Sequence, residues 1–320
     1  MNTCLDRIKE KREDWVAPEI PEHIPQGDMP GDKIHISSGI IANANIVFAE
    51  LLKQLEEVLK QNPTEKIVIT VCGGSGVGKS ELASLLSYYF NQIGIGSYTM
   101  SGDNYPRRIP KYNDAERMRI FRNSGVRGLV QSGEYTDERF DVLQELQRQE
   151  QDANQEYIKE CPWLAIYRNA GKEGLKQYLG TAAEIDFDEV STIVEEFKNG
   201  AETIWLKRMG RDETALWYNQ IDFSKINILI IEWTHGNSDN YAGVDIPVLL
   251  NSTPQETLAH RKARNRDGKT DSPFTMLVLE LEQEMLRRQA HKAKIILSKA
   301  GELLSYEEYC KLMEESEATK

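Results

Sequence analysis

The chain has 320 residues, with 39 basic and 51 acidic side chains and a net charge of −12. This length allows one large α/β domain with additions, or two domains, and it is enough to bury a full core. The negative charge argues against general affinity for nucleic acid or anionic membranes. Because the four cysteines are scattered, no apolar run reaches membrane-spanning length and the N-terminus is too charged for a signal peptide, we expect a cytoplasmic protein.

The first 65 residues are expected to form an arm and a helix that pack on a core domain. Residues 1–14 predict a short charged helix, and residues 15–33 carry four prolines and predict an extended arm lying on something else. Ser37 or Ser38 is a suitable cap for a long helix with one apolar face, which Pro63 ends.

A phosphate-binding loop is the strongest signal in the chain. A β-branched run at 66–71 predicts a buried strand, residues 73–80 fit G-x-x-x-x-G-K-[ST], and apolar residues up to Ile93 have helical spacing. A glycine-rich turn with a chance lysine is the alternative, but the strand before the loop and the helix after it favour nucleotide binding. The predicted nucleotide contacts are Gly73, Gly74, Ser75, Gly76, Val77, Gly78, Lys79, Ser80 and Glu81.

Within this loop, each residue type has a physical reason. The glycines let the backbone turn sharply and leave its N–H groups free to point at one anion. The following helix adds its unpaired first-turn N–H groups. Lys79 is expected to reach the terminal phosphates, and Ser80 to ligate Mg²⁺.

The next candidate is Asp103, which follows a second predicted strand at 97–100. Ligands of parallel sheets bind beyond the carboxyl ends of the strands, so Asp103 should lie near the phosphates. It is the candidate base for the hydroxyl of an acceptor molecule. The alternative is an aspartate that only shapes a turn. The nearby Arg107 and Arg108 belong to a local cluster of cations that either receives an anionic acceptor or is a solvated helix face.

Residues 111–185 are mostly polar and predict a helical insertion, and 188–198 predicts an amphipathic helix. Strand signals return at 203–206 and 214–218. The clearest is the apolar strand 226–231, which ends in Glu232. An acid in that position is suited to hold the water shell of Mg²⁺, against the alternative of a carboxylate at a strand end on the surface.

The last third predicts a strand at 246–250, whose early proline suggests an edge position or the beginning of a strand. A basic helix over 254–267, a helix over 274–290 and a final strand at 293–297 follow. Arginines on a mobile segment can close over a nucleotide and stabilise transition-state charge. We therefore expect a lid over 260–290 rather than a solvated face, with the cations Arg261, Arg264 and Arg266.

Taken together, these motifs resemble the uridine kinase and phosphoribulokinase family of P-loop kinases. The resemblance rests on residues 73–80, on 101–105 with an aspartate followed by an aromatic residue, on 228–232, on 187–200, on 264–269 and on 295–297. It implies that Asp103 is the base, that Lys79 and the lid arginines hold phosphates, and that Ser80 and Glu232 serve Mg²⁺. Tyr105, Arg107 and Arg108 are the further residues expected near the acceptor.

The chain also departs from that family. The insertion is larger than expected, and the Asp-His-Pro before the amphipathic helix is replaced by residues 183–186, which puts uridine as the acceptor in doubt. The expected fold is an α/β P-loop NTPase with three α/β/α layers and a mostly parallel sheet. We expect residues 66–310 to be the kinase domain and 311–320 a tail.

The sequence therefore favours an ATP- and Mg²⁺-dependent kinase that phosphorylates a hydroxyl of a sugar, a sugar phosphate or a nucleoside. The alternative is a nucleotide-dependent switch or assembly NTPase without a small-molecule acceptor. The expected partner is the small acceptor, with no nucleic acid and no membrane; a homodimer and a preference for GTP over ATP stay open.

Overall fold

A computed structural model describes residues 3–212, 214–253, 255–259, 261 and 272–318. The chain forms two compact units. The first comprises residues 1–105, 187–253 and 286–320, and the second comprises residues 106–186 and 254–285. Among the helices in the described ranges, none combines the length and apolar character needed to cross a bilayer.

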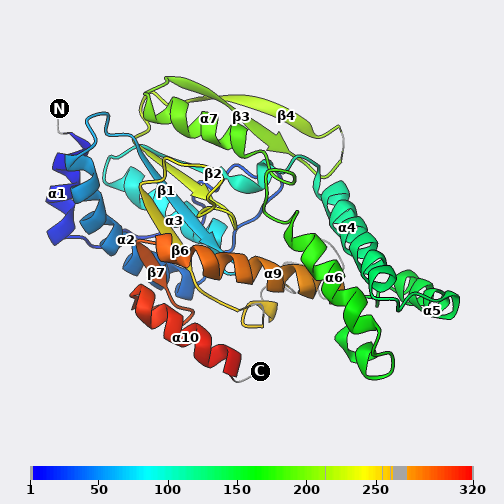
Figure 1. The fold of residues 1–320 in the computed structure, drawn as a ribbon. Helices are drawn as coiled ribbons and strands as arrows, with labels where there is room; N and C mark the ends of the chain where they lie inside the picture. The colour runs from blue at the N-terminus through cyan, green and yellow to red at the C-terminus, as the bar shows by residue number, and fades with distance from the viewer. Residues whose placement is uncertain (1–2, 213, 254, 260, 262–271, 319–320) are drawn as a thin grey trace. The chain divides into compact units, whose positions relative to one another are not determined.

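The first unit is built on a six-stranded sheet in the order β2-β5-β1-β6-β7-β8 (Figure 1). Its first five strands are parallel and only β8 is antiparallel, which confirms the predicted mostly parallel sheet. The bounds are β1 Ile67–Gly73, β2 Ser97–Ser101, β5 Ile228–Glu232, β6 Ile246–Leu250, β7 Ile295–Leu297 and β8 Leu303–Leu304. Because β6 lies between β1 and β7, Pro247 marks the beginning of a strand and not an edge.

Helices cover both faces of this sheet. On one face the apolar side chains of β1 pack against α2 (Ser38–Lys60) and α3 (Lys79–Gln92). On the other face Cys72 contacts the end of α9 (Pro273–Gln289) and α10 (Tyr306–Ala318). The three layers follow from the nearly continuous apolar run of β1, which is buried on both faces of the sheet. The segment expected as a tail is therefore largely helical up to residue 318.

The N-terminal arm lies on this unit. After α1 (Cys4–Glu13) the chain has no regular structure until Ser37, which caps α2. Trp15 packs against Phe48 and Tyr89, with ring centroids 4.4 and 5.3 Å apart. The arm thus contributes to the same core as the helices.

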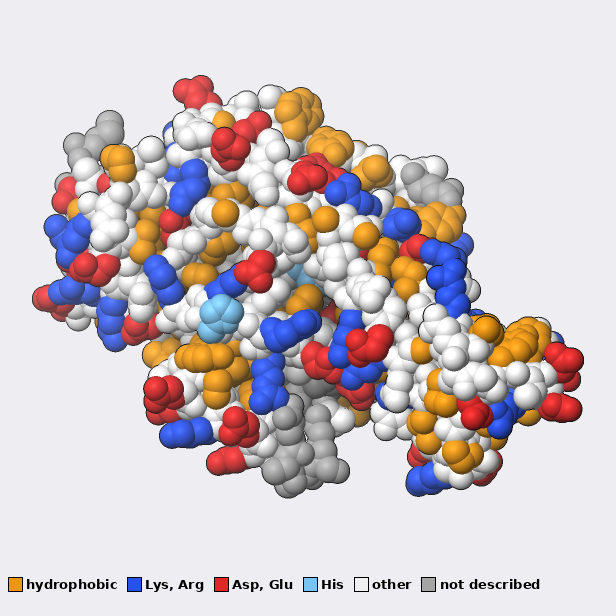
Figure 2. All heavy atoms as spheres, viewed as in Figure 1, with side chains coloured by type: hydrophobic (Ala, Val, Ile, Leu, Met, Phe, Trp, Pro, Cys, Tyr) orange, Lys and Arg blue, Asp and Glu red, His pale blue; other side chains and the backbone are white. Residues whose placement is uncertain are grey.

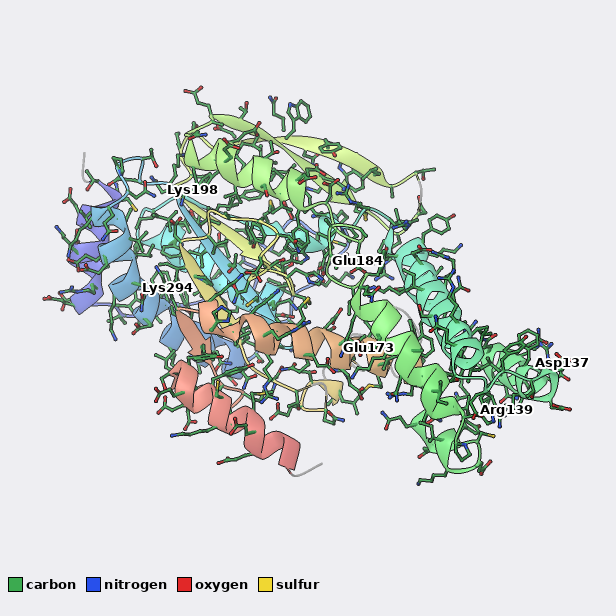
Figure 3. The ribbon with its side chains drawn as sticks, viewed as in Figure 1. Asp137, Arg139, Glu173, Glu184, Lys198 and Lys294 are labelled. Atoms are coloured by element: carbon green, nitrogen blue, oxygen red, sulfur yellow. The ribbon has the colours of Figure 1, made fainter. Side chains whose placement is uncertain are left out.

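A two-stranded sheet completes the first unit. Strands β3 (Thr203–Met209) and β4 (Leu216–Asp222) pair antiparallel, and α7 (Phe187–Lys198) packs against β3. At the end of α7, Lys198 forms an ion pair of 2.6 Å with Asp245, which precedes β6 (Figure 3 labels Lys198). The hairpin leaves large apolar side chains exposed, and Figure 2 shows hydrophobic side chains along the upper edge of the molecule, where the hairpin lies. They are Trp205, Leu216, Trp217 and Tyr218.

The second unit is helical and has its own core. It contains α4 (Pro110–Gln131), α5 (Asp137–Arg148), α6 (Leu164–Lys176) and the first part of α9. Helices α4 and α6 approach closely through glycines: a Cβ on Gly171 would lie 2.6 Å from the Phe121 ring. The buried Glu184, labelled in Figure 3, accepts hydrogen bonds from Asn113, Arg117 and the Gly180 N–H. The predicted insertion is thus an ordered unit, in which Phe274 and Leu277 also belong to the core.

Candidate active site

The phosphate loop occupies the turn between β1 and α3. Gly73 and Gly78 have φ angles of 153° and 99°, which favour glycine over other residues. A Cβ on Gly73 would lie 2.6 Å from the carbonyl oxygen of Leu250, and one on Gly78 would lie 2.7 Å from Cδ1 of Ile40. Both glycines are therefore required by geometry. The segment thus forms the sharp turn between a strand and a helix that the sequence predicted.

The beginning of α3 is open to an anion. Its N-cap residue is Gly78, so no side chain caps the first-turn N–H groups. Lys79 starts the helix, and its Nζ donates to the carbonyl oxygen of Gly74 at 3.1 Å. The ammonium group thus lies directly over the loop. The Glu81 side chain is buried, so only the backbone of this predicted nucleotide contact is suited to face a phosphate.

Glu232 lies at the end of β5, between the loop and the Asp103 turn. In the sheet it is level with Val71 of β1 and Ser101 of β2. Its carboxylate accepts hydrogen bonds from Ser80 Oγ at 3.3 Å and from Ser101 Oγ at 2.6 Å. The two residues predicted to serve Mg²⁺ are therefore in contact. Ser101 was missed by sequence reasoning, although its place at the end of the strand before Asp103 was a usable signal.

The charged groups of Lys79, Glu232 and Asp103, at the carboxyl ends of the strands, interact electrostatically. Glu232 is only 4% exposed, and burial raises the pKa of its carboxyl group above the ordinary value. The negative charge of Asp103 raises this pKa further, whereas the positive charge of Lys79 lowers it. The structure thus brings Lys79, Glu232 and Asp103 into one electrostatic environment, as expected for residues at the carboxyl ends of neighbouring strands.

Asp103 lies in the short helical turn 102–104 directly after β2, and its side chain is exposed. Gly102 lies so close to the indole ring of Trp233 that an added Cβ would be 2.1 Å from it. On the other side, Asn104 accepts a hydrogen bond from the Met209 N–H at 3.0 Å. The turn is therefore held from both sides while its carboxylate stays open to solvent.

The other predicted acceptor contacts are engaged within the protein. Tyr105 is fully buried and its hydroxyl donates to Met100 Sδ at 3.7 Å, so it supports the turn from inside. Arg107 forms an ion pair with Asp186 at 3.2 Å and donates to Ala182 O. Arg108 donates to the Tyr178 hydroxyl at 3.0 Å. These two arginines belong to the second unit.

The predicted lid is described only in part. Arg261 is buried in the second unit, where it donates to Thr257 Oγ1. Arg264 and Arg266 lie outside the described residues, as does most of the predicted basic helix.

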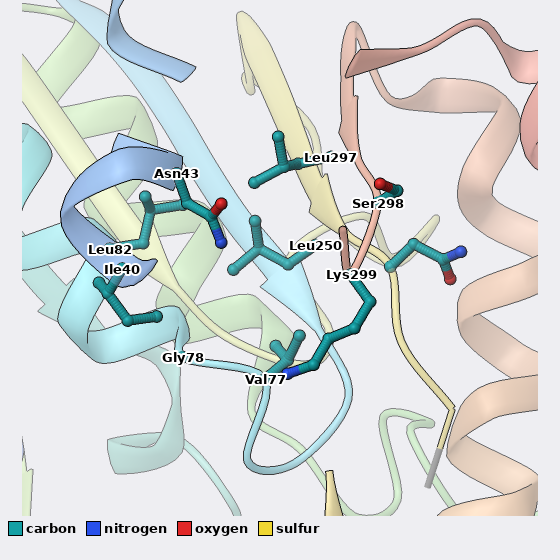
Figure 4. Close-up of a pocket in the computed structure, with 10 residues that line it drawn as sticks. Ile40, Asn43, Val77, Gly78, Leu82, Leu250, Leu297, Ser298 and Lys299 are labelled. Carbon is teal, nitrogen blue, oxygen red and sulfur yellow. The ribbon is translucent and has the colours of Figure 1, made fainter. Parts of the chain in front are cut away.

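A small cavity of about 50 Å³ adjoins the phosphate loop (Figure 4). Ile40 and Asn43 of α2 line one side, and Leu250 and Leu297 lie at the ends of β6 and β7. In Figure 4 the Lys299 side chain extends toward Val77 of the loop. The sequence did not predict that the helix before the strand would contact the loop, because this contact depends on how α2 packs.

No protein-family model matches the chain. A curated relative, the bifunctional alpha-galactosidase/sucrose kinase AgaSK of Mediterraneibacter gnavus, is 38% identical over 251 residues. The match covers 78% of this chain and 22% of that protein, so the chain spans about a fifth of the length of its relative.

Solved structures with a similar fold carry less weight. D-glycerate 3-kinase from Cryptococcus neoformans is 12% identical with a TM-score of 0.47, covering 84% of this chain and 98% of its own. A protein assigned as a fructose transport system kinase from Silicibacter sp. TM1040 is 13% identical with a TM-score of 0.45, covering 77% and 94%. Over most of its length, however, the chain is clearly similar in sequence to a segment of a bifunctional alpha-galactosidase/sucrose kinase.

Proposed function

We propose that this chain is an ATP- and Mg²⁺-dependent kinase that transfers the γ-phosphoryl group to a hydroxyl group of a sugar. The observation that carries the proposal is the convergence of Lys79, Glu232 and Asp103 at one edge of the parallel sheet. Phosphoryl transfer requires a phosphate cradle, a cation site and a base for the acceptor, and this edge offers a candidate for each.

The residues fit a nucleoside triphosphate. The loop turns sharply at Gly73 and Gly78, where a Cβ would meet protein atoms at 2.6 and 2.7 Å, and the uncapped N-terminus of α3 presents its N–H groups. Lys79 would exchange its hydrogen bond to Gly74 for the terminal phosphates, since an ammonium group binds an anion more strongly than a neutral carbonyl.

The donor set also fits Mg²⁺, a hard cation that prefers oxygen ligands and keeps several waters. Ser80 supplies a hydroxyl and Glu232 a buried carboxylate beside it. When bound, Mg²⁺ would neutralise negative charge on the phosphates. The raised pKa of Glu232 reflects a buried carboxylate that a nearby cation would stabilise in its charged form.

Asp103 would act as the base. Its carboxylate is exposed and would accept the proton of the acceptor hydroxyl, whose oxygen then bonds to the γ-phosphorus while ADP leaves. The rigid turn around Asp103 keeps this group in place. The choice of a sugar acceptor is supported by the sucrose kinase in the name of the relative that is 38% identical.

The test is an ADP-release assay of the purified chain with ATP, Mg²⁺ and one acceptor at a time: sucrose, fructose, glucose, glycerate or uridine. We expect the fastest release with sucrose and a phosphorylated sugar in the mass spectrum. Asp103→Asn should lower kcat by about 10²- to 10⁴-fold while nucleotide affinity is kept. Asp137→Asn, a matched change of an exposed aspartate on α5, should have no effect.

Two results would contradict the proposal. Acceptor-independent hydrolysis alone would favour a nucleotide-dependent switch, and Asp103→Asn turning over at the wild-type rate would exclude Asp103 as the base.

A further inference from the structure

The N-terminal arm inserts one carboxylate beside the candidate base. Asp28 comes from the arm, and its side chain is only 8% exposed. Oδ1 accepts from the Ser101 N–H at 2.7 Å and from Asn104 Nδ2 at 3.2 Å. Oδ2 accepts from the Tyr98 hydroxyl and from the Arg208 guanidinium, both at 3.0 Å. Four donors from three parts of the first unit therefore meet at one side chain.

These donors surround the turn that carries Asp103. Ser101 and Asn104 flank it along the chain, and β2 is an edge strand of the sheet. The Ser101 N–H, bound by a side chain of the arm, thus receives the acceptor that a further strand would otherwise supply. Ser101 also donates a hydrogen bond from its side-chain hydroxyl to the carboxylate of Glu232.

The second oxygen of Asp28 links the turn to the hairpin. Arg208 of β3 donates to the Tyr98 hydroxyl at 2.8 Å as well as to Asp28. The neighbouring Met209 N–H binds Asn104 Oδ1 at 3.0 Å. The backbone of the turn is therefore fixed through Asp28 on one side and through β3 on the other.

Attachment of the arm does not explain why the charged side chain of Asp28 is buried. Trp15, Ile20 and Ile24 already pack the arm against the apolar core, so attachment does not require Asp28. Burying a carboxylate costs free energy even when it is paired, so a buried ion pair is weak evidence for a stabilising role. A buried carboxylate with four directed hydrogen bonds at this place points to a role in geometry.

We propose that Asp28 is a positioning residue, which holds residues 101–104 so that the Asp103 carboxylate faces the acceptor hydroxyl. This inference rests on the proposed function, because it requires Asp103 to be the base. Asp28 itself touches neither the acceptor nor the nucleotide. Its loss should lower kcat without changing nucleotide affinity.

The experiment compares Asp28→Ala and Asp28→Asn with Glu22→Gln, a matched change of an exposed acid in the same arm. We expect kcat to fall at least tenfold in Asp28→Ala and less in Asp28→Asn, which keeps an acceptor oxygen. The Kd of a non-hydrolysable ATP analogue should stay within about twofold in all three, and Glu22→Gln should match the wild type. If Asp28→Ala does not fold, Asp28→Asn alone carries the test.

A double variant separates positioning from general damage. In the Asp103→Asn background, Asp28→Ala should lower kcat no further, because both changes remove the same contribution. If a folded Asp28 variant keeps full kcat while Asp103→Asn is inactive, this inference is wrong and the proposed function stands. Additive losses of kcat in the double variant would have the same meaning. Full activity of Asp103→Asn would overturn the proposed function and this inference with it.

Discussion

The contact between Gly102 and Trp233 gives a sharp prediction for Gly102→Ala. The added Cβ would lie 2.1 Å from Cγ of the indole, roughly 1.3 Å short of the 3.4 Å at which ordinary contact begins. Trp233 cannot move easily, because it is 2% exposed and packs against Phe187 and His235 with ring centroids 5.5 and 5.3 Å away. The turn must therefore shift, and Asp103 with it.

The expected cost falls on catalysis more than on folding. Overpacking of this kind typically costs about 1–3 kcal/mol of unfolding free energy. A displacement of about 1 Å of a reacting group can lower the rate about 100-fold. We expect kcat to fall by about this factor, with the Kd for nucleotide unchanged, because the atoms nearest to the added Cβ belong to Trp233 and not to the phosphate loop.

The assay is steady-state kinetics with the best acceptor, together with urea unfolding and nucleotide titration. Gly39→Ala is the control, since a Cβ there meets only Ser37 Oγ at 3.9 Å and the residue lies in the first turn of α2. A folded Gly102→Ala variant with kcat within twofold of the wild type would refute the reasoning, because the turn would then tolerate the displacement.

Three further predictions concern other parts of the chain. Lys79→Ala should weaken nucleotide affinity and kcat together, each at least about tenfold; titration with a fluorescent nucleotide checks this, and unchanged affinity would contradict it. Gly171→Ala should lower the unfolding free energy by about 1–3 kcal/mol, because its Cβ would meet the Phe121 ring at 2.6 Å; an unchanged urea midpoint would show that the two helices can separate at no cost. Burial raises the pKa of Asp28 from 3.8 to about 6 in the folded protein. The protonated side chain therefore stabilises the folded state fully below pH 3.8, and this stabilisation is lost as the pH rises to about 6. Relative to Asp28→Asn, the wild type should lose about 3 kcal/mol of unfolding free energy across this range, and a gain instead would show that the ion pair with Arg208 outweighs burial.

The phosphate loop could be predicted from the sequence because its residues are close together along the chain. Its glycines, Lys79 and Ser80 are consecutive, and the strand and helix around them have the apolar patterns that those elements require. The strand ending in Glu232 was equally clear, because a strand buried on both faces is a continuous apolar run. Since parallel strands end at the same edge of a sheet, the closeness of Asp103 to Glu232 also followed.

Other features depended on contacts between distant parts of the chain. Asp28 is 73 residues from Ser101, and the arm has neither helical nor strand periodicity, so no pattern could link them. The close packing of Gly102 on Trp233 appears only when β2 and β5 pair in register. Likewise, Phe274 joins the core of the second unit although it follows Phe121 by more than 150 positions. The sequence by itself determined which groups can bind phosphate, because that chemistry is local; only the tertiary structure decided what holds Asp103 in place, because those contacts are made by side chains brought together in folding.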